Sequence, residues 1–541
     1  MDKQKVTSAA LNSRDALLKS LADELFGVES GKILVAKDIN IFGLVYTLYK
    51  KGDALTAAVT GSSGKDIEII IPETIKYNGN DYKVDKICNS AFCLNTKTEI
   101  IGIPSGIENI EKHTFERCTS LRKISVSEEN AKYSSNFEGV LFSKDRKTLM
   151  VYPAGKKDSA YVVPKDVEKI ADGAFYGNLN LKYADMPDSV ILIGDQAFYN
   201  CSGLISVCVS QKLTVIGNNA FMGCSSLKHM EVPGATELIG DAAFCGCSSL
   251  IMINVSVSNK SYYSYNGILF DKNRKSLKVY PSGRTDEGYY VPEHVSVIEK
   301  HAFYKCNFLK SVYIDEHVTE IEKQAFYRCV SLENVNVSLN NRRYRSEHGI
   351  LYNSTLTELI LYPAQKKYDT FTVSDKTVKI AENAFSSSRH LKCVILPESI
   401  RIIEDYAFFN CSGLRYVSLS RKTEIIGDYA FGYCVHLKNV AIPGSVSKIG
   451  EFAFECCFEM RCVSILKGVT QISKSAFLYC RSLTDISIPR SVTSIESAAF
   501  CGCLNLINIY YEGSKLEWSK INTDNSYSGN KPLISAGKHC A

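Results

Sequence analysis

The dipeptide Ala-Phe returns along this chain at a fixed interval, and no other feature constrains the fold as strongly. Fourteen phenylalanines take part, and ten of the thirteen intervals between them are 23 residues long. A constant period of this length is typical of solenoids, in which each unit buries its apolar face against its neighbours. The repeat phenylalanines are Phe92, Phe115, Phe175, Phe198, Phe221, Phe244, Phe303, Phe326, Phe385, Phe408, Phe431, Phe454, Phe477 and Phe500.

Other residue types keep a constant distance from the repeat phenylalanine. Ile stands five residues before it in all 14 repeats, and Leu stands six residues after it in 12. An Ile-x-Ile stretch, often followed by Pro, predicts a short strand with one buried face. Asp or Asn three residues before the Phe predicts the cap of a one-turn helix at Ala-Phe. Ile216, Phe221, Cys224 and Leu227 represent the buried columns in one coil, and we expect stacking to join each column into a continuous core.

Three intervals of 59 or 60 residues contain an extra, different coil. Each holds a Gly-Val/Ile-Leu-Phe/Tyr block and a Leu-x-x-Tyr-Pro block, 13 residues apart from Gly to Tyr, beginning at Gly139, Gly267 and Gly349. Two apolar runs around a polar stretch predict a β-hairpin. The long intervals therefore indicate 14 ordinary coils and three hairpin variant coils.

The repeated unit Val-x-x-Ile-x-x-x-Ala-Phe-x-x-Cys-x-x-Leu-x-x-Ile-x-Ile-Pro resembles the BspA-type leucine-rich repeat, over about residues 44 to 521. The resemblance implies a repeat solenoid: a right-handed leucine-rich-repeat superhelix, dominated by strands with short helical turns and with a parallel sheet on its concave face. It also implies that the concave face binds another protein or a glycan. Some members of the family are bacterial surface proteins that bind host matrix or other cells.

The ends of the chain depart from the repeat. Ser8 to Phe26 places its apolar residues largely on one helical face, and Asn78-Gly79 is typical of a hairpin turn. Residues after 521 lose the pattern and are predicted to be loose. The predicted divisions are an N-terminal helix and linker (1–43), N-terminal cap hairpins (44–86), the solenoid (87–511, with variant coils near 127–164, 256–292 and 338–374) and a C-terminal cap and tail (512–541).

Composition narrows the compartment and the partners. The net charge of +5 over 541 residues is too weak to indicate nucleic acid, and no apolar stretch is long enough for a transmembrane helix. The first 27 residues lack the apolar core of a signal peptide, which predicts a cytoplasmic protein. The family resemblance implies the alternative, a cell-surface or secreted protein.

The cysteines and histidines do not form a reactive arrangement. Eleven of the 20 cysteines share one column, three residues after the Phe, which holds Asn or Ser in other repeats. This substitution pattern favours buried structural thiols, free in a reducing cytosol, over disulfides or a metal site. The nine histidines have no nucleophile or acid at a recurring distance. We therefore expect no enzyme active site, no metal and no cofactor.

A surface column gives the best indication of a binding site. The position seven residues after the Phe opens the concave strand and is basic in eight of the thirteen repeats from Phe115 onward, four of them consecutive. Like charges about 5 Å apart repel, so such a row is either solvated or matched by an acidic partner. Tyrosines of the strand face are further contact candidates. The candidate binding residues are Lys392, Arg415, Lys438, Arg461, Tyr313 and Tyr416.

These observations predict a non-enzymatic scaffold that binds a protein or glycan, with an acidic partner for the basic row. Two alternatives remain open: a cell-surface adhesin whose export route is not visible, and an intracellular regulator or scaffold. A hydrolase built on the repeats is a third alternative, and the lack of a catalytic constellation speaks against it.

Overall fold

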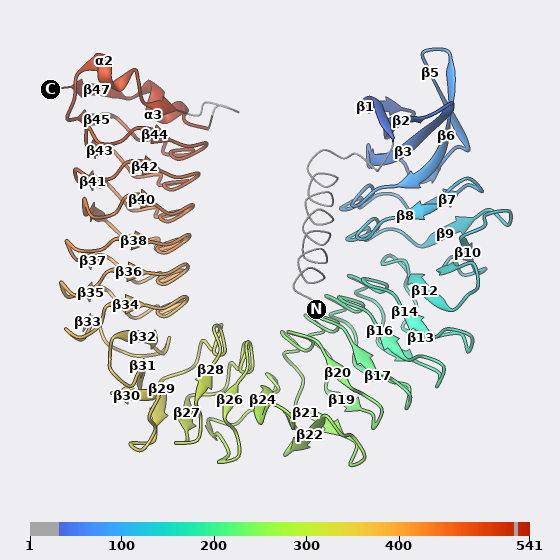
Figure 1. Cartoon of the computed structure of the whole chain (residues 1–541), viewed down its shortest axis with the longest axis horizontal. Coiled ribbons are helices and arrows are strands. Elements are labelled where there is room, and N and C mark those ends of the chain that lie inside the picture. The colour runs from blue at the N-terminus through green and yellow to red at the C-terminus, as the bar shows by residue number, and fades with distance from the viewer. Residues whose placement is uncertain (1–31, 524–528, 541) are drawn as a thin grey trace, which may run out of the picture. The chain divides into compact units, whose positions relative to one another are not determined.

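The computed structural model describes residues 32–523 and 529–540 (Figure 1). Its contacts divide the chain into two compact units. The first ends at Cys247 and adds Ser256–Asn259, and the second comprises Ser248–Val255 and the chain from Lys260 onward. Each unit is a strand-dominated solenoid of stacked coils, and the predicted 87–511 repeat region is shared between them. The helix predicted over residues 8–26 lies outside the described residues.

An ordinary coil has three sides: a strand of three or four residues, a strand of two residues, and a chain of turns around Ala-Phe. The longer strand comes from Ile-x-Ile, and the two-residue strand ends at the invariant Ile five residues before the Phe. Parallel pairing keeps the 23-residue register, so that Ile193 pairs with Ile216 and Ile216 with Ile239. We call the side formed by the longer strands the strand face.

In the first unit, the strands form an N-terminal sheet, two strand-face sheets and one sheet of two-residue strands that starts in a variant coil. The N-terminal sheet contains β1 (Ile33–Ile41), β2 (Leu44–Lys51), β3 (Ala54–Ser62), β5 (Thr74–Tyr77), β6 (Asn80–Ile87) and β8 (Asn109–Ile110). The strand-face sheets are β4 (Glu68–Ile70), β7 (Ile100–Ile103) and β9 (Lys123–Val126), then β13 (Ala160–Val162), β15 (Tyr183–Asp185) and β17 (Ser206–Cys208), followed along the chain by β19 (His229–Val232). The remaining sheet is β10 (Tyr133–Ser135), β11 (Leu141–Ser143), β12 (Thr148–Val151), β14 (Lys169–Ile170), β16 (Leu192–Ile193), β18 (Val215–Ile216) and β20 (Leu238–Ile239).

The second unit repeats this plan twice. Its strand-face strands are β21 (Met252–Val255), β25 (Gly288–Tyr290), β27 (Ser311–Ile314), β29 (Asn334–Val337), β33 (Thr370–Thr372), β35 (Cys393–Ile395), β37 (Tyr416–Ser418), β39 (Asn439–Ile442), β41 (Cys462–Ile465), β43 (Asp485–Ile488), β45 (Asn508–Tyr511) and β47 (Gly537–Cys540). The first sheet of the opposite side is β22 (Tyr262–Tyr265), β23 (Ile268–Asp271), β24 (Ser276–Val279), β26 (Val297–Ile298) and β28 (Glu320–Ile321). The second is β30 (Tyr344–Glu347), β31 (Ile350–Asn353), β32 (Glu358–Leu361), β34 (Lys379–Ile380), β36 (Ile402–Ile403), β38 (Ile425–Ile426), β40 (Lys448–Ile449), β42 (Gln471–Ile472), β44 (Ser494–Ile495) and β46 (Asn522–Thr523). The helices α2 (Lys515–Trp518) and α3 (Lys531–Ser535) follow β45.

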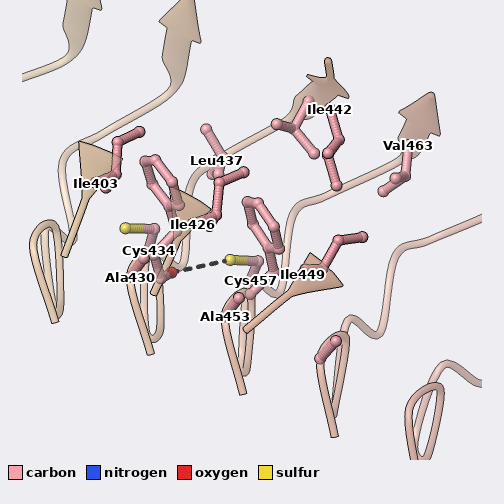
Figure 2. Close-up of a cluster of buried hydrophobic side chains, with 14 of the residues drawn as sticks. Ile403, Ile426, Ala430, Cys434, Leu437, Ile442, Ile449, Ala453, Cys457 and Val463 are labelled. Atoms are coloured by element: carbon pink, nitrogen blue, oxygen red, sulfur yellow. Dashed lines mark hydrogen bonds between the residues drawn. The ribbon is translucent and has the colours of Figure 1, made fainter. Parts of the chain in front are cut away.

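The core consists of columns of equivalent residues stacked from coil to coil. The ring of Phe221 lies between those of Phe198 and Phe244, with centroid distances of 5.1 and 5.8 Å and nearly parallel planes. Figure 2 shows the same arrangement in the second unit, where Ile403, Ile426 and Ile449 occupy one column. Every coil thus supplies the apolar surface that covers its neighbour, which explains why the period is so strictly kept.

The Ala-Phe segment forms consecutive β-turns and not the predicted one-turn helix. In all 14 repeats the residues two before and two after the Phe have positive φ, as at Asn219 (+53°) and Gly223 (+80°). A right-handed helix does not accommodate these φ values, whereas the third position of a type II turn requires one. The Asp or Asn three residues before the Phe does not cap a helix and has another role. The Asp195 carboxylate accepts a hydrogen bond from the amide of Asn218, its equivalent in the next coil (2.7 Å).

The turns form a ladder of their own. The amides two before, at and two after the Phe donate to carbonyls three before, one before and one after the Phe of the next coil. The turn of Phe385 shows all three bonds, from Asn383, Phe385 and Ser387, at 3.2, 2.7 and 2.9 Å. Every turn therefore presents amides on one edge and carbonyls on the other, and where two ordinary coils follow each other these edges pair.

A variant coil lacks the Ala-Phe turn. It has an antiparallel three-stranded meander, as in β10–β11–β12, and the Tyr of Tyr-Pro occupies the place of the Phe. In the first two variant coils the hydroxyl of this Tyr donates to an Asp six residues later, over 3.2 Å from Tyr152 and 2.6 Å from Tyr280. In the third, Tyr368 stands at that position, and the buried hydroxyl of Tyr362 has no partner in the described part of the chain.

Both ends are more ordered than the sequence predicted. Residues 33–41, assigned above to a linker, form β1, which pairs antiparallel with β2. The predicted loose tail contains α3 and β47, and β47 extends the sheet of β45 in parallel. The buried Asn530 completes this end, because its Oδ1 accepts from the Phe500 amide (3.1 Å) and its Nδ2 donates to the Glu496 carbonyl (3.0 Å). A single side chain thus pairs with the central amide of the last turn edge, a role that no repeat pattern can reveal.

Candidate binding surface

The four consecutive basic residues lie in one row in the second unit. Lys392, Arg415, Lys438 and Arg461 each stand directly before a strand of the strand face: β35, β37, β39 and β41. Backbone hydrogen bonds join each amide to the carbonyl of the preceding member, at 2.8 Å for Arg415, 3.2 Å for Lys438 and 2.7 Å for Arg461. The constant offset from the 23-residue period therefore places them at equivalent points of successive coils. We call these four residues the basic row.

The members of the basic row differ in how their charge is compensated. Lys392 forms an ion pair with Asp369 of the preceding coil (2.8 Å). The ammonium of Lys438 lies 5.8 Å from the centroid of the Tyr416 ring. Arg415 and Arg461 are exposed, and within residues 32–523 and 529–540 neither forms an ion pair. Lys438 also forms no ion pair in these ranges, so Lys392 alone among the four has a carboxylate within ion-pair distance.

One carboxylate lies close enough to be influenced by the row. Hydrogen bonding from His436, in the preceding coil, lowers the pKa of Glu459, and the positive charges of Lys438 and Arg415 lower it further. The His436 Nδ1 and the Glu459 carboxylate are 2.7 Å apart. The basic row thus has an acidic neighbour on its own surface, although this carboxylate is engaged by the histidine.

The two candidate tyrosines are not brought together. Tyr416 lies on β37, half-exposed, within the same sheet as the start of the basic row. Tyr313 lies on β27, in the separate sheet β25–β27–β29, and its ring stacks on that of Tyr290 at 4.1 Å. A variant coil stands between the two sheets in the sequence. The basic row and Tyr416 therefore form one surface, and Tyr313 belongs to another.

The residues selected to represent the core are fully buried. Ile216, Phe221, Cys224 and Leu227 each have a relative exposure of 0%. The Cys224 thiol donates to the carbonyl of Phe198 in the preceding coil (3.1 Å), and Figure 2 shows the equivalent bond from Cys457. Burial raises the pKa of Cys224 well above its usual range, so the thiol stays protonated and serves as a donor.

Sequence reasoning missed the acids that pair with the basic column. Asp369 and Glu287 lie in variant coils, 23 residues before Lys392 and Lys310, and both form ion pairs with them. The basic column was traced only through coils that contain Ala-Phe. Extending the 23-residue offset by one step into the variant coils would have found both acids.

The described residues hold neither a metal-binding cluster nor a membrane-spanning helix. Residues 32–523 and 529–540 contain no group of three His, Cys, Asp or Glu side chains placed to hold a metal ion. Over the same ranges, no helix has the length and apolar character needed to cross a bilayer.

Comparison with known proteins agrees with this geometry. The chain matches the family description "BspA type Leucine rich repeat region (6 copies)" over residues 70–142, 156–270, 287–370, 362–424 and 403–523. Among solved structures, it is similar to a leucine rich cell surface protein from Faecalibacterium prausnitzii, with 23% identity, coverage of 91% of this chain and 98% of that one, and a TM-score of 0.40. The pneumococcal vaccine antigen PcpA gives 18% identity, coverage of 95% and 100%, and a TM-score of 0.41. A leucine-rich repeat protein from Bacteroides ovatus gives 21% identity, coverage of 93% and 100%, and a TM-score of 0.29.

No curated protein matches the sequence. The family match nevertheless extends over most of the repeat region and coincides with the coils seen in the structure. The chain belongs to the BspA-type leucine-rich repeat family.

Proposed function

We propose that this protein is a binding scaffold whose strand face holds an acidic segment of another protein at the basic row. The observation that supports this most is the unequal charge compensation within the row. Lys392 has a carboxylate at 2.8 Å, whereas Arg415 and Arg461 have none in the described part of the chain. A guanidinium group binds a carboxylate through two parallel hydrogen bonds, so two arginines of the strand face that form no ion pair suit carboxylate side chains of a partner.

The spacing of the row supports an extended partner. Arg415 and Arg461 are two coils apart, which corresponds to about 9.6 Å at the usual strand spacing. Lys438 lies between them, and its ammonium lies over the ring of the half-exposed Tyr416. Aromatic and arginine side chains are enriched at protein interfaces, and both occur here side by side. An acidic segment running along the row would contact all three cationic groups.

The test measures anisotropy of a fluorescent polyglutamate peptide titrated with the full chain. A sulfated glycan is titrated in a second arm, because both ligands are polyanions. We expect the Arg415→Ser/Arg461→Ser variant to bind the peptide at least about tenfold more weakly, which corresponds to about 1.4 kcal/mol. The matched control is Lys392→Ser, whose charge is already paired, and its affinity should change by less than about twofold.

Salt provides a second criterion. Binding should weaken as salt rises to physiological strength, where the screening length falls to about 8 Å. Equal losses for the double arginine variant and the lysine control would contradict the role of charge compensation. Tighter binding of the sulfated glycan than of the peptide would indicate that the partner is a glycan and not a protein.

A further inference from the structure

A cavity of about 540 Å³ opens in the second unit on the side of the Ala-Phe turns, away from the basic row. It lies where the third variant coil has no Ala-Phe turn of its own. Its walls are the turn of Phe326 on one side and the turn of Phe385 on the other. Its floor is the variant coil, with Ile360, Leu361 and Pro363. We call this space the turn-side cavity.

The missing turn leaves backbone groups without their usual partners. In ordinary coils the next turn covers the amide edge, but here the next turn is two coils away. The amides of Gln324, Phe326 and Arg328 accordingly make no hydrogen bond within residues 32–523 and 529–540. On the opposite wall, the Tyr362 amide donates a hydrogen bond to the carbonyl of Ala384 (2.7 Å).

Two carbonyls of that opposite wall stay uncovered. Those of Glu382 and Ser386 accept no hydrogen bond in the described part of the chain, although their equivalents in ordinary coils do. A further acceptor of the lining is the Oδ1 of Asn383, which is buried and has no partner there. The equivalent main-chain groups at the first variant coil are also unpaired within residues 32–523 and 529–540. The third variant coil differs in having a larger cavity beside these groups and the buried, unpaired Asn383 Oδ1 in its lining, and buried polar groups are paired in nearly all proteins.

The charged side chains around the cavity compensate one another. Lys379 pairs with Glu404 at 2.9 Å and with Glu358 at 3.0 Å. Arg274 pairs with Glu322 at 2.7 Å. Most carboxylates of the lining are therefore engaged in ion pairs, and the main chain supplies most of the unpaired polar groups of the walls.

The side chain of Arg328 is likewise engaged elsewhere. Its guanidinium lies 5.4 Å from the centroid of the Tyr327 ring and hydrogen bonds to the hydroxyls of Tyr327 and Tyr304. Gln324 and Lys323 reach across one end of the cavity to Glu382, with the Gln324 Nε2 and a Glu382 oxygen 2.5 Å apart. A ligand would therefore enter from the other end, at Ser386.

The first variant coil shows what a filled version of this space looks like. There the corresponding cavity has only about 170 Å³, and it is lined by Tyr176, which stands where the larger cavity has Ser386. The Tyr176 ring stacks on Tyr199 of the next coil at 4.9 Å, and its hydroxyl hydrogen bonds to Arg117. Replacement of tyrosine by serine at this one position removes the side chain that fills the gap.

We propose that the turn-side cavity binds a short extended segment of a partner polypeptide through its main chain. In ordinary coils the amides equivalent to 324, 326 and 328 donate to alternate carbonyls of the neighbouring main chain, and a partner main chain would supply the same acceptors here. The two turn walls are two coils apart, about 9.6 Å, which leaves the width of one strand between them. The apolar floor takes uncharged side chains of the segment. This site is independent of the basic row.

The test selects random seven-residue peptides on phage against the full-length protein and titrates synthetic copies by fluorescence anisotropy. Ser386→Tyr, which copies Tyr176, should weaken binding by at least about tenfold. Tyr176→Ser is the matched control and should leave binding at the turn-side cavity unchanged. Hydrogen exchange of the wild type should slow in residues 322–330 on binding and stay unchanged in residues 109–118. This readout decides the matter even if Ser386→Tyr fails to fold.

Backbone chemistry distinguishes main-chain recognition from side-chain recognition. Replacing two alternate amide linkages of the peptide by esters weakens their carbonyl acceptors and should reduce affinity by about fivefold or more. Failure to select any peptide, unchanged affinity for Ser386→Tyr, or unchanged affinity of the ester peptides would each overturn the proposal. Self-association of the wild type that Ser386→Tyr abolishes, without peptide binding, would overturn it in favour of a second copy of this chain as occupant.

Discussion

Replacement of Phe221 by Ala tests whether the stacked phenylalanine column holds the first unit together. The side chain is fully buried and lies between two parallel rings at 5.1 and 5.8 Å. Truncation of a buried Phe costs about 3–5 kcal/mol in the free energy of unfolding. Each lost ring pair accounts for about 0.5–1.5 kcal/mol of that loss. We therefore expect a loss of about 4–5 kcal/mol in the free energy of unfolding.

Two further variants are expected to lose less stability and serve as comparisons for Phe221→Ala. Phe115 is 8% exposed and stacks on one ring only, that of Phe92 at 5.8 Å. Phe115→Ala should therefore cost less, about 3 kcal/mol. Lys228 is exposed in the same coil as Phe221, and Lys228→Ala should cost less than about 0.5 kcal/mol.

The assay is a urea titration followed by circular dichroism, with hydrogen exchange of residues 215–227 as a local probe. Long repeat stacks lose cooperativity, so a change in slope is expected if one part of the stack unfolds first. The local probe then reports the coil that carries the substitution. Equal losses for Phe221→Ala and Lys228→Ala would refute the assignment of buried and exposed columns.

Three further predictions concern buried polar groups. Ser388→Cys should stabilise the protein by about 1 kcal/mol in the same urea titration. The unpaired serine hydroxyl is replaced by a thiol that reaches the carbonyl of Tyr362. An unchanged urea midpoint would contradict this. Tyr368→Asp should also raise the thermal midpoint, because it restores an acceptor for the buried Tyr362 hydroxyl as in the other variant coils, and Tyr368→Asn separates hydrogen bonding from charge. Burial raises the pKa of Cys201 to about 12, above its unfolded value, so the folded state binds more protons and stability should fall as pH rises from about 9 to 12. Thiol labelling of folded protein at pH 9 should therefore leave Cys201 unmodified by mass spectrometry.

A fixed period predicts that residues at the same offset have equivalent surroundings in every coil. This equivalence accounts for most of the features that could be predicted from the sequence. The buried columns of Ile216, Phe221, Cys224 and Leu227 follow from it, because residues at one offset meet the same neighbours in every coil. The same reasoning placed the basic row. This reasoning failed for the turns. Two positions of each turn have positive φ, and they accept many residue types, from Gly223 to side chains as large as that of Tyr433. Positive φ imposed by stacking leaves no clear signal in composition.

Compensation of charge was missed because the basic column was followed only through coils that contain Ala-Phe. The partner of Lys392 is Asp369, one period earlier in a variant coil. The order at the C-terminal end was missed for a different reason. Asn530 pairs with a backbone amide of the last turn, and nothing in its own surroundings in the sequence repeats. Contacts made once in a chain have no period by which to find them.

The interruptions of the repeat therefore carry more functional information than the repeat itself. In a regular stack every turn edge is covered by the next coil, so ordinary coils leave few backbone groups free for a ligand. In the last turn of the second unit, the Phe500 amide pairs with Asn530. At the first variant coil the gap is narrowed by Tyr176, whereas at the third it stays open beside Ser386. One sequence thus contains a filled and an open version of the same defect. The open version, with Ser386 where the filled one has Tyr176, is therefore the place at which a partner is expected to bind.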